Sequence, residues 1–130
     1  MRCIEISAMG YTIIHNIDKD SPVVDYETLR EIFARMEDPI EWFEVVKVRI
    51  ADKKYLMLLD DNGKLRRKPY NRIASLIYNN PNDVIVGNVI ILADSLTNDG
   101  EMYFLNNEDV LNVLLTANYP LNNPLLSPAT

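Results

Sequence analysis

The residues best suited to chemistry lie in one short stretch, positions 63–72. Arginine can bind a phosphate or a carboxylate through two parallel hydrogen bonds, and an asparagine amide can both donate and accept. Five cations fall within nine positions of this stretch, so it predicts a loop that binds an anionic ligand or an acidic partner. The candidate contact residues are Lys64, Arg66, Arg67, Tyr70, Asn71 and Arg72, with Lys68 as the remaining cation.

The same residues also allow a purely structural interpretation. Loop asparagines commonly bond to nearby backbone groups, so Asn71 can serve the loop itself. Arg72 can pair with an acid of the C-terminal part, and the run 64–68 can be a solvated face, because exposed charges are usual. Both interpretations remain open at the level of sequence.

Other groups with catalytic potential stand apart from one another. His15 is the only histidine, and strand periodicity places no acid or cysteine beside it, whereas a zinc site needs converging ligands. Cys3, the single cysteine, is expected to be a buried and inert thiol. The acid pairs at 37–38, 60–61 and 108–109 are expected to cap turns and helices or to stay hydrated. No phosphate-cradling glycine loop or nucleophile elbow occurs, so an enzyme is disfavoured and no cofactor or metal is expected.

Four tyrosines gather in the C-terminal half. They can form an aromatic ligand wall or an interface patch, since tyrosine is enriched at interfaces, or they can simply rim the core. They are Tyr70, Tyr78, Tyr103 and Tyr119.

Charge is divided unevenly along the chain. Residues 1–72 carry all 13 lysines and arginines and 13 of the 19 acids, whereas residues 73–130 carry six acids and no cation. The net charge of −6 therefore arises in the C-terminal part. An acidic balance disfavours general nucleic-acid binding, which depends on neutralising phosphates. It favours contact with a basic protein surface, because complementary charge speeds encounter.

Size and composition indicate a single domain in the cytoplasm. The chain has 130 residues, of which 48% are hydrophobic and 25% charged, as in an ordinary globular domain. One cysteine cannot form an internal disulfide, which fits a reducing compartment. No apolar run reaches about 18 residues, so no membrane span is expected. Glu5 interrupts any apolar signal region, so secretion is not expected.

Hydrophobic periodicity predicts an α+β domain over residues 1–118, with two main helices on a mostly antiparallel sheet. Asn62-Gly63 is expected to turn the chain, because both residues tolerate positive φ. Gly87, inside an apolar run, indicates a bulge or a close backbone approach. Residues 119–130 contain three prolines and are expected to form an extended tail. Strands are expected over 2–7, 11–17, 42–50, 55–60, 84–92 and 102–105, and helices over 26–36, 71–78 and 108–118. The apolar stretch 84–92 is expected to be a central strand buried on both faces. Asp25 is expected to cap the first helix, and Asn106 or Asn107 the last.

Several short motifs occur in the order found in a known family. Pro69-Tyr70-Asn71-Arg72 resembles a Pro-x-Asn-Arg signature, and the stretch 83–88 resembles an Asp-Ile-Ile-x-Gly strand. Together with the acidic glycine turn at 60–64 and the helix start at 108–109, this order resembles domain-of-unknown-function family 3846. Its members are small proteins of bacteria, phages and mobile elements. The resemblance implies a phage or mobile-element setting in a bacterial host, and it implies no activity.

Two functions follow from these observations as hypotheses. The preferred one is a non-catalytic protein that inhibits or regulates a host or element-encoded protein through an acidic C-terminal surface. The alternative is a small-ligand binder in which the loop 64–72 holds a nucleotide-like anion and a tyrosine stacks on its base. An exposed strand edge would also allow a dimer, so the oligomeric state stays open.

Overall fold

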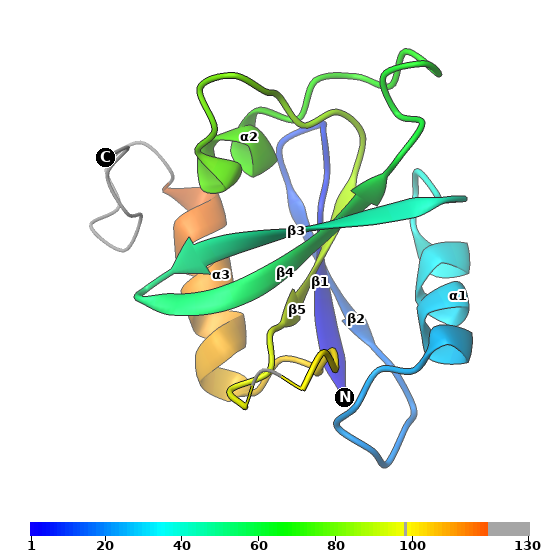
Figure 1. Cartoon of the computed structure of the whole chain (residues 1–130), viewed down its shortest axis with the longest axis vertical. Helices are drawn as coiled ribbons and strands as arrows, with labels where there is room; N and C mark the ends of the chain where they lie inside the picture. Colours follow the sequence, from blue (N-terminus) through cyan, green and yellow to red (C-terminus); the bar gives the residue numbers. More distant parts are fainter. Residues whose placement is uncertain (98, 120–130) are drawn as a thin grey trace.

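The chain folds into five strands and three helices within the part that the computed structural model describes, residues 1–97 and 99–119 (Figure 1). In chain order the elements are β1 (Arg2–Ile6), β2 (Thr12–Asn16), α1 (Tyr26–Arg35), β3 (Phe43–Ile50), β4 (Lys53–Asp60), α2 (Arg72–Tyr78), β5 (Val89–Ala93) and α3 (Asn107–Asn118).

All five strands pair antiparallel in one sheet of order β2-β1-β5-β4-β3. The hairpins β1–β2 and β3–β4 flank β5, which is the last strand in sequence but the central one in space. Each of its five residues is buried, because helices cover both faces there. The predicted α+β class and the predicted central strand are therefore confirmed.

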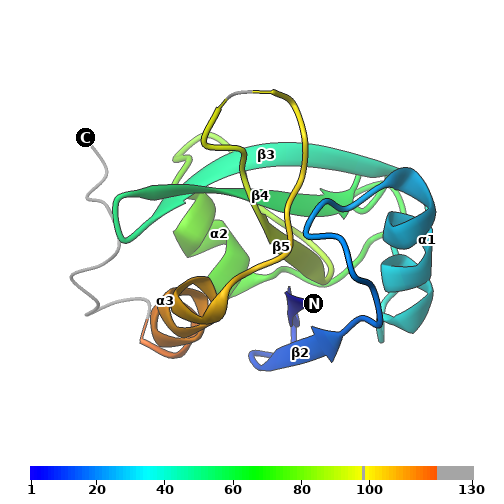
Figure 2. The same ribbon diagram turned by 90° about the horizontal axis from the view of Figure 1, so that it is seen from below.

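Alternation along the strands separates two cores, one on each face of the sheet. On β1, Ile4 and Ile6 join the core beneath α2 and α3, whereas Cys3 joins the core beneath α1. Glu5 shares the α1 face with Cys3, because side chains two apart on a strand point the same way. Figure 2 shows α2 and α3 together on one side of β3 and β4, with α1 well apart from both.

Side-chain caps begin all three helices. Asp25 accepts a hydrogen bond from the Thr28 N–H at 2.8 Å, as the sequence predicted. Asn106 and Asp109 form a reciprocal capping box at the start of α3. Asn71 caps α2, so the short helix expected at 71–78 is a third element of the fold beside the two main helices.

Three local expectations differ from the structure. The strand expected at 84–92 begins only at Val89, because Gly87 adopts φ +75° and ends the extended path. The strand expected at 102–105 is reduced to isolated bridges, since Tyr103 pairs with both Val23 and Ala93. The β3–β4 turn lies at Ala51-Asp52, both with positive φ, and Lys53 already belongs to β4.

The predicted tail at 119–130 lies outside the described residues from position 120 onward, and Tyr119 is the C-cap of α3. None of the helices within the described part combines the length and apolarity needed to cross a membrane.

Replacing Ile91 by alanine should cost about 2–5 kcal/mol of unfolding free energy, because its side chain is fully buried at the centre of the sheet. Ile14→Ala on the edge strand β2 is the matched control, since that side chain is partly exposed and should cost less than half as much. Urea denaturation measures both variants. Equal losses would contradict the placement of the core around β5.

Candidate functional site

The loop at residues 63–72 is fastened to the rest of the protein by alternate cations. Lys64 forms an ion pair with Asp83. Arg66 forms an ion pair with Glu41, and its Nη1 lies 3.6 Å from the Oδ2 of Asp60. These acids come from three separate parts of the chain, so the loop is tied down at several points.

Lys68 makes the most buried of these contacts. Its Nζ lies 3.0 Å from both Asp38 Oδ1 and Asp60 Oδ2, and donates to the Pro39 carbonyl at 3.0 Å. The side chain of Asp60 is 1% exposed and that of Lys68 is 9% exposed. Asp60 Oδ2 has no well-aligned hydrogen bond among the described atoms, so charge attraction alone holds it to Lys68. Removing one partner would leave a buried, uncompensated charge, at a cost on the order of 3–5 kcal/mol.

The intervening residues of the loop face solvent. Leu65 is 85% exposed, and Tyr70 is exposed as well. Arg67 and Arg72 are exposed and form no ion pair with any residue that the structure describes. Arg67 also holds φ at +56°, a conformation that costs free energy for a residue with a side chain. The positive φ expected at Asn62-Gly63 is thus found four residues later.

Asn71 points into the protein, which is the structural alternative that the sequence left open. It is fully buried, and its side-chain oxygen accepts from the Ala74 N–H at 3.0 Å, which caps α2. Its amide nitrogen donates to the carbonyls of Ile6 and Gly87 at 3.0 and 2.9 Å. Because every polar atom of the side chain is occupied, Asn71 cannot contact a ligand in this conformation, and we remove it from the candidate set.

The two motifs that carry the family resemblance lie side by side. The Asn71 N–H donates to the Ile85 carbonyl at 2.8 Å, and the Gly87 N–H donates to the Pro69 carbonyl at 2.7 Å. A β-bridge joins the segments between these two bonds. The motifs are therefore two halves of one structural unit that supports the base of the loop.

Gly87 is required at this junction for two reasons. Its φ of +75° favours glycine, and an added Cβ would lie only 2.8 Å from Cδ of Lys68 and 3.2 Å from Oδ2 of Asp38. The expected close approach at Gly87 is confirmed, although it lies just before β5 and not in the middle of a strand.

The division of charge along the sequence is not reproduced in space. Three of the six acids beyond position 72 pair with lysines that precede it, because the fold brings the two parts of the chain together. The pairs are Asp83 with Lys64, Asp94 with Lys47 at 3.5 Å, and Asp109 with Lys53 at 2.7 Å. The acidic C-terminal surface expected from the sequence therefore loses half of its charges to neutralisation.

Asp109 is a buried structural acid. Its Oδ1 accepts hydrogen bonds from Lys53 Nζ and from the Tyr55 hydroxyl, both at 2.7 Å, and its Oδ2 accepts the Asn106 N–H at 3.0 Å. Burial, together with the bond to Asp109, raises the pKa of Tyr55 above its usual value. Capping by Asp109 agrees with the sequence. Asp60 also caps a turn, as expected, because its Oδ1 accepts the Asn62 N–H at 3.0 Å, while its Oδ2 is buried against Lys68.

Glu5 lies beside His15, contrary to the expectation that His15 has no acidic neighbour. The antiparallel register of β1 and β2 sets the two residues diagonally on the α1 face, and His15 Nε2 lies 2.7 Å from Glu5 Oε1. Glu5 is fully buried and also accepts from Asn88 Nδ2 at 2.6 Å and from the Glu37 N–H at 3.3 Å. The hydrogen-bonding groups compensate the buried carboxylate.

Cys3 is directly opposite His15 in the β1–β2 register, so the sequence also missed this proximity. Burial raises the pKa of the Cys3 thiol to about 12, and the nearby Glu5 carboxylate acts in the same direction. Among the described contacts, no hydrogen bond joins the thiol to the imidazole. A protonated thiol without access to solvent is a poor nucleophile, so the grouping of Cys3, His15 and Glu5 does not form a catalytic site.

The four tyrosines do not gather into one wall. Tyr78 and Tyr103 pack at the edge of the core beneath α2 and α3, whereas Tyr70 and Tyr119 are exposed. Two of them therefore follow the core-rim interpretation, and only Tyr70 belongs to the loop.

The pocket next to the loop does not suit an anion. It measures about 130 Å³, and Lys64 shares its lining with four acids, Glu44, Asp60, Asp61 and Asp83. Asp83 is paired with Lys64 and Asp60 with Lys68, and the remaining carboxylates of the lining, Glu44 and Asp61, repel a phosphate. Within residues 1–97 and 99–119, no three His, Cys, Asp or Glu side chains are placed to hold a metal ion.

Asn71→Ala should destabilise the protein by about 2–4 kcal/mol, because it removes a helix cap and leaves two buried carbonyls without a donor. Arg72→Ala, one residue away and exposed, should change the unfolding free energy by less than about 0.5 kcal/mol. Chemical denaturation checks both. A stable Asn71→Ala variant would show that the side chain is not structural.

The Cys3 thiol should resist Ellman's reagent in the folded protein and react once urea unfolds it. Because folding raises its pKa from 9.0 to about 12, its stabilising contribution is complete below pH 9 and is lost as the pH rises towards 12. The unfolding free energy should therefore fall above pH 9, by at most about 1.4 kcal/mol per pH unit for this group. Cys3→Ala should show a shallower fall, and an identical slope would refute the assignment.

Comparison with known proteins identifies no relative of this chain. No family model matches the chain, and no curated protein and no solved structure matches it either. The resemblance to domain-of-unknown-function family 3846 therefore stays a prediction.

Proposed function

We propose that this protein is a non-catalytic protein-binding module, an inhibitor or regulator, and that the loop at residues 63–72 is its main contact surface. The observation that supports the proposal is that the loop contains two kinds of residue, cations paired within the protein and exposed residues without such a pair. Lys64, Arg66 and Lys68 pair with acids of the protein itself, while Leu65 and Arg67 are left facing solvent.

A loop held in this way favours tight binding. Ordering a flexible loop costs free energy at the moment of association, and the buried ion pair of Lys68 with Asp60 meets part of that cost in the free protein. The pairs of Lys64 and Arg66 are exposed to solvent and add little. The exposed set of Leu65, Arg67, Tyr70 and Arg72 combines an apolar side chain with the residue types that most often dominate binding energy. The strained φ of Arg67 also supports a functional role for the loop tip.

The sign of the free charge indicates an acidic partner. Arg67 and Arg72 are the cations of the loop without an ion pair among the described residues, and both are exposed. This reverses the preferred sequence hypothesis, which assigned contact with a basic partner to an acidic C-terminal surface, and follows the other expectation, that the loop binds an anion or an acidic partner. The loop is the stronger candidate because three of those acids are already neutralised by lysines.

A nucleotide ligand is less well supported by the same geometry. The pocket that Lys64 lines is dominated by acids, and Asn71 has no free polar atom with which to read a base. The phage or mobile-element setting and the bacterial cytoplasm rest on the family resemblance and the composition, and they remain part of the proposal.

The test is affinity capture with matched charge reversals. Tagged wild-type protein and the variant Arg67→Glu are passed over bacterial lysate at low and high salt, and captured proteins are identified by mass spectrometry. Arg49→Glu is the control, because Arg49 is also exposed and unpaired among the described residues but lies on β3. Binding of a purified candidate should weaken at least about tenfold with Arg67→Glu and stay unchanged with Arg49→Glu.

Equal retention of every captured protein by all three forms would contradict the loop as the contact surface. A thermal-shift panel of nucleotides separates the alternative function, since a bound ligand raises the melting temperature. A rise with one nucleotide that Arg72→Ala abolishes would favour a small-ligand binder instead.

A further inference from the structure

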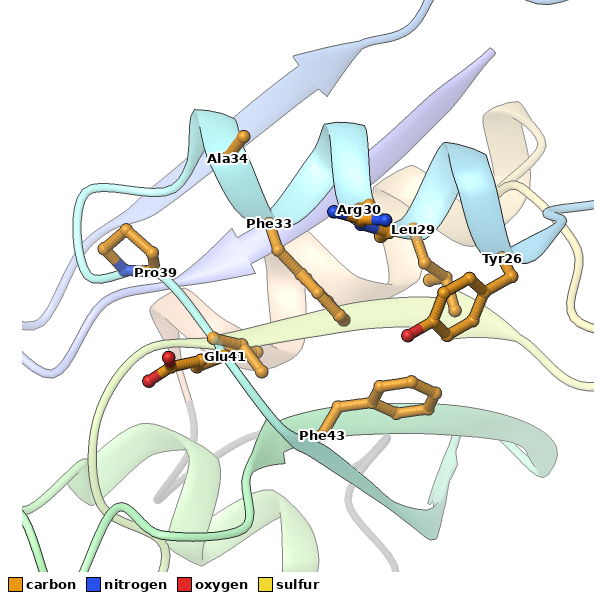
Figure 3. Close-up of a pocket in the computed structure, with 9 residues that line it drawn as sticks. Tyr26, Leu29, Arg30, Phe33, Ala34, Pro39, Glu41 and Phe43 are labelled. Carbon is orange, nitrogen blue, oxygen red and sulfur yellow. The ribbon is translucent and has the colours of Figure 1, made fainter.

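A second surface is hollowed between α1 and the segment that leads into β3. The hollow measures about 270 Å³ and is open to solvent. Figure 3 shows Tyr26, Phe33 and Phe43 around it, with Arg30 on the helix and Glu41 on the opposite wall. None of these residues belongs to the loop at 63–72, so the hollow is a separate feature, which we call the α1 groove.

The α1 groove has an apolar base and aromatic walls. Leu29 and Phe33 are buried and form its base, and the Phe33 and Phe43 rings lie 5.6 Å apart at an interplanar angle of 54°. Tyr26 is 65% exposed at one end. Tyr26 and Phe33 are seven residues apart on α1, so the groove follows the helix for about 10 Å.

The free charge in the α1 groove is positive. Glu41 is neutralised by its ion pair with Arg66, whereas Arg30 is exposed and has no ion pair among the described residues. An apolar group that carries a carboxylate beside it would match both features, because the rings would cover the apolar part and Arg30 would bind the acid.

The size of the α1 groove favours a single side chain as its occupant. Pockets for whole drug-sized ligands measure roughly 300–1,000 Å³ and enclose most of the ligand, whereas this one is smaller and open. Protein interfaces commonly place one aromatic or aliphatic side chain in such a pocket.

We propose that the α1 groove binds a peptide segment of a protein partner, with one aromatic or branched aliphatic side chain between Tyr26 and Phe43 and a neighbouring aspartate or glutamate paired with Arg30. This goes beyond the loop contact, although the two surfaces are linked. The groove wall at Pro39 and Glu41 is held by Lys68 and Arg66 of the loop, so one partner could reach both surfaces.

The test is a titration of ¹⁵N-labelled protein with two blocked synthetic peptides, followed by nuclear magnetic resonance. One peptide has a central phenylalanine flanked by glutamates, and the other has the same phenylalanine flanked by lysines. The glutamate peptide should shift the amides of α1 and of residues 40–43, which line or adjoin the groove. It should bind at least tenfold more tightly than the lysine peptide, and Arg30→Glu should reverse that preference.

Three control variants test where the peptide binds. Tyr26→Ala should weaken binding of the glutamate peptide about tenfold, whereas Tyr119→Ala should leave it unchanged, although both tyrosines are similarly exposed at 65% and 64%. Arg49→Glu should likewise have no effect. Arg67→Glu should bind the peptide as the wild type does, so failure of the groove and failure of the loop are told apart.

Three outcomes would overturn the proposal. They are no shifts in these residues at millimolar peptide, equal affinity for the two peptides, and binding of free phenylacetate as tightly as the glutamate peptide. The last would make the α1 groove a site for small aromatic acids and not for a peptide.

Discussion

The buried ion pair between Lys68 and Asp60 holds together the part of the molecule on which function is proposed. Asp60 ends β4, so the pair fastens the loop to the second strand from the sheet edge. The same ammonium group binds Asp38 and the Pro39 carbonyl, and so joins the loop to the segment between α1 and β3. A buried charge costs free energy unless an opposite charge compensates it, so removing Lys68 would leave the Asp60 carboxylate uncompensated, and removing Asp60 would weaken the hold on Lys68.

The need to hold the base of the loop around this buried ion pair explains why Gly87 and Asn71, which belong to motifs that look functional in the sequence, are structural residues. The backbone at Gly87 makes room for the methylene groups of Lys68, and Asn71 joins the end of β1, the segment before β5 and the first turn of α2. A binding motif and the residues that a loop base requires are hard to tell apart in a linear sequence. In the folded protein they separate by contacts, because Asn71 and Lys68 are engaged with other parts of the protein whereas Arg67 and Arg72 have no ion pair among the described residues.

The two surfaces proposed for binding share one rigid support. Arg66 and Lys68 connect the loop to the wall of the α1 groove through Glu41, Asp38 and the Pro39 carbonyl. Both present a free arginine next to apolar side chains, Arg67 near Leu65 and Arg30 near Tyr26. A partner with apolar side chains set among acids would be complementary to both, which is a more specific requirement than net charge alone provides.

The sequence by itself determined the α+β class, the central place of the apolar strand and the helix start at Asp25, and it narrowed the start of α3 to Asn106 or Asn107. These features depend on local periodicity and on capping side chains. It also located the loop. Only the tertiary structure decided which cations of that loop are free, since their partners Asp38, Glu41, Asp60 and Asp83 lie elsewhere in the chain. The register between β1 and β2 likewise placed Glu5 beside His15. The periodicity of one strand does not show which residue of another strand it will face, so the sequence could not predict this contact.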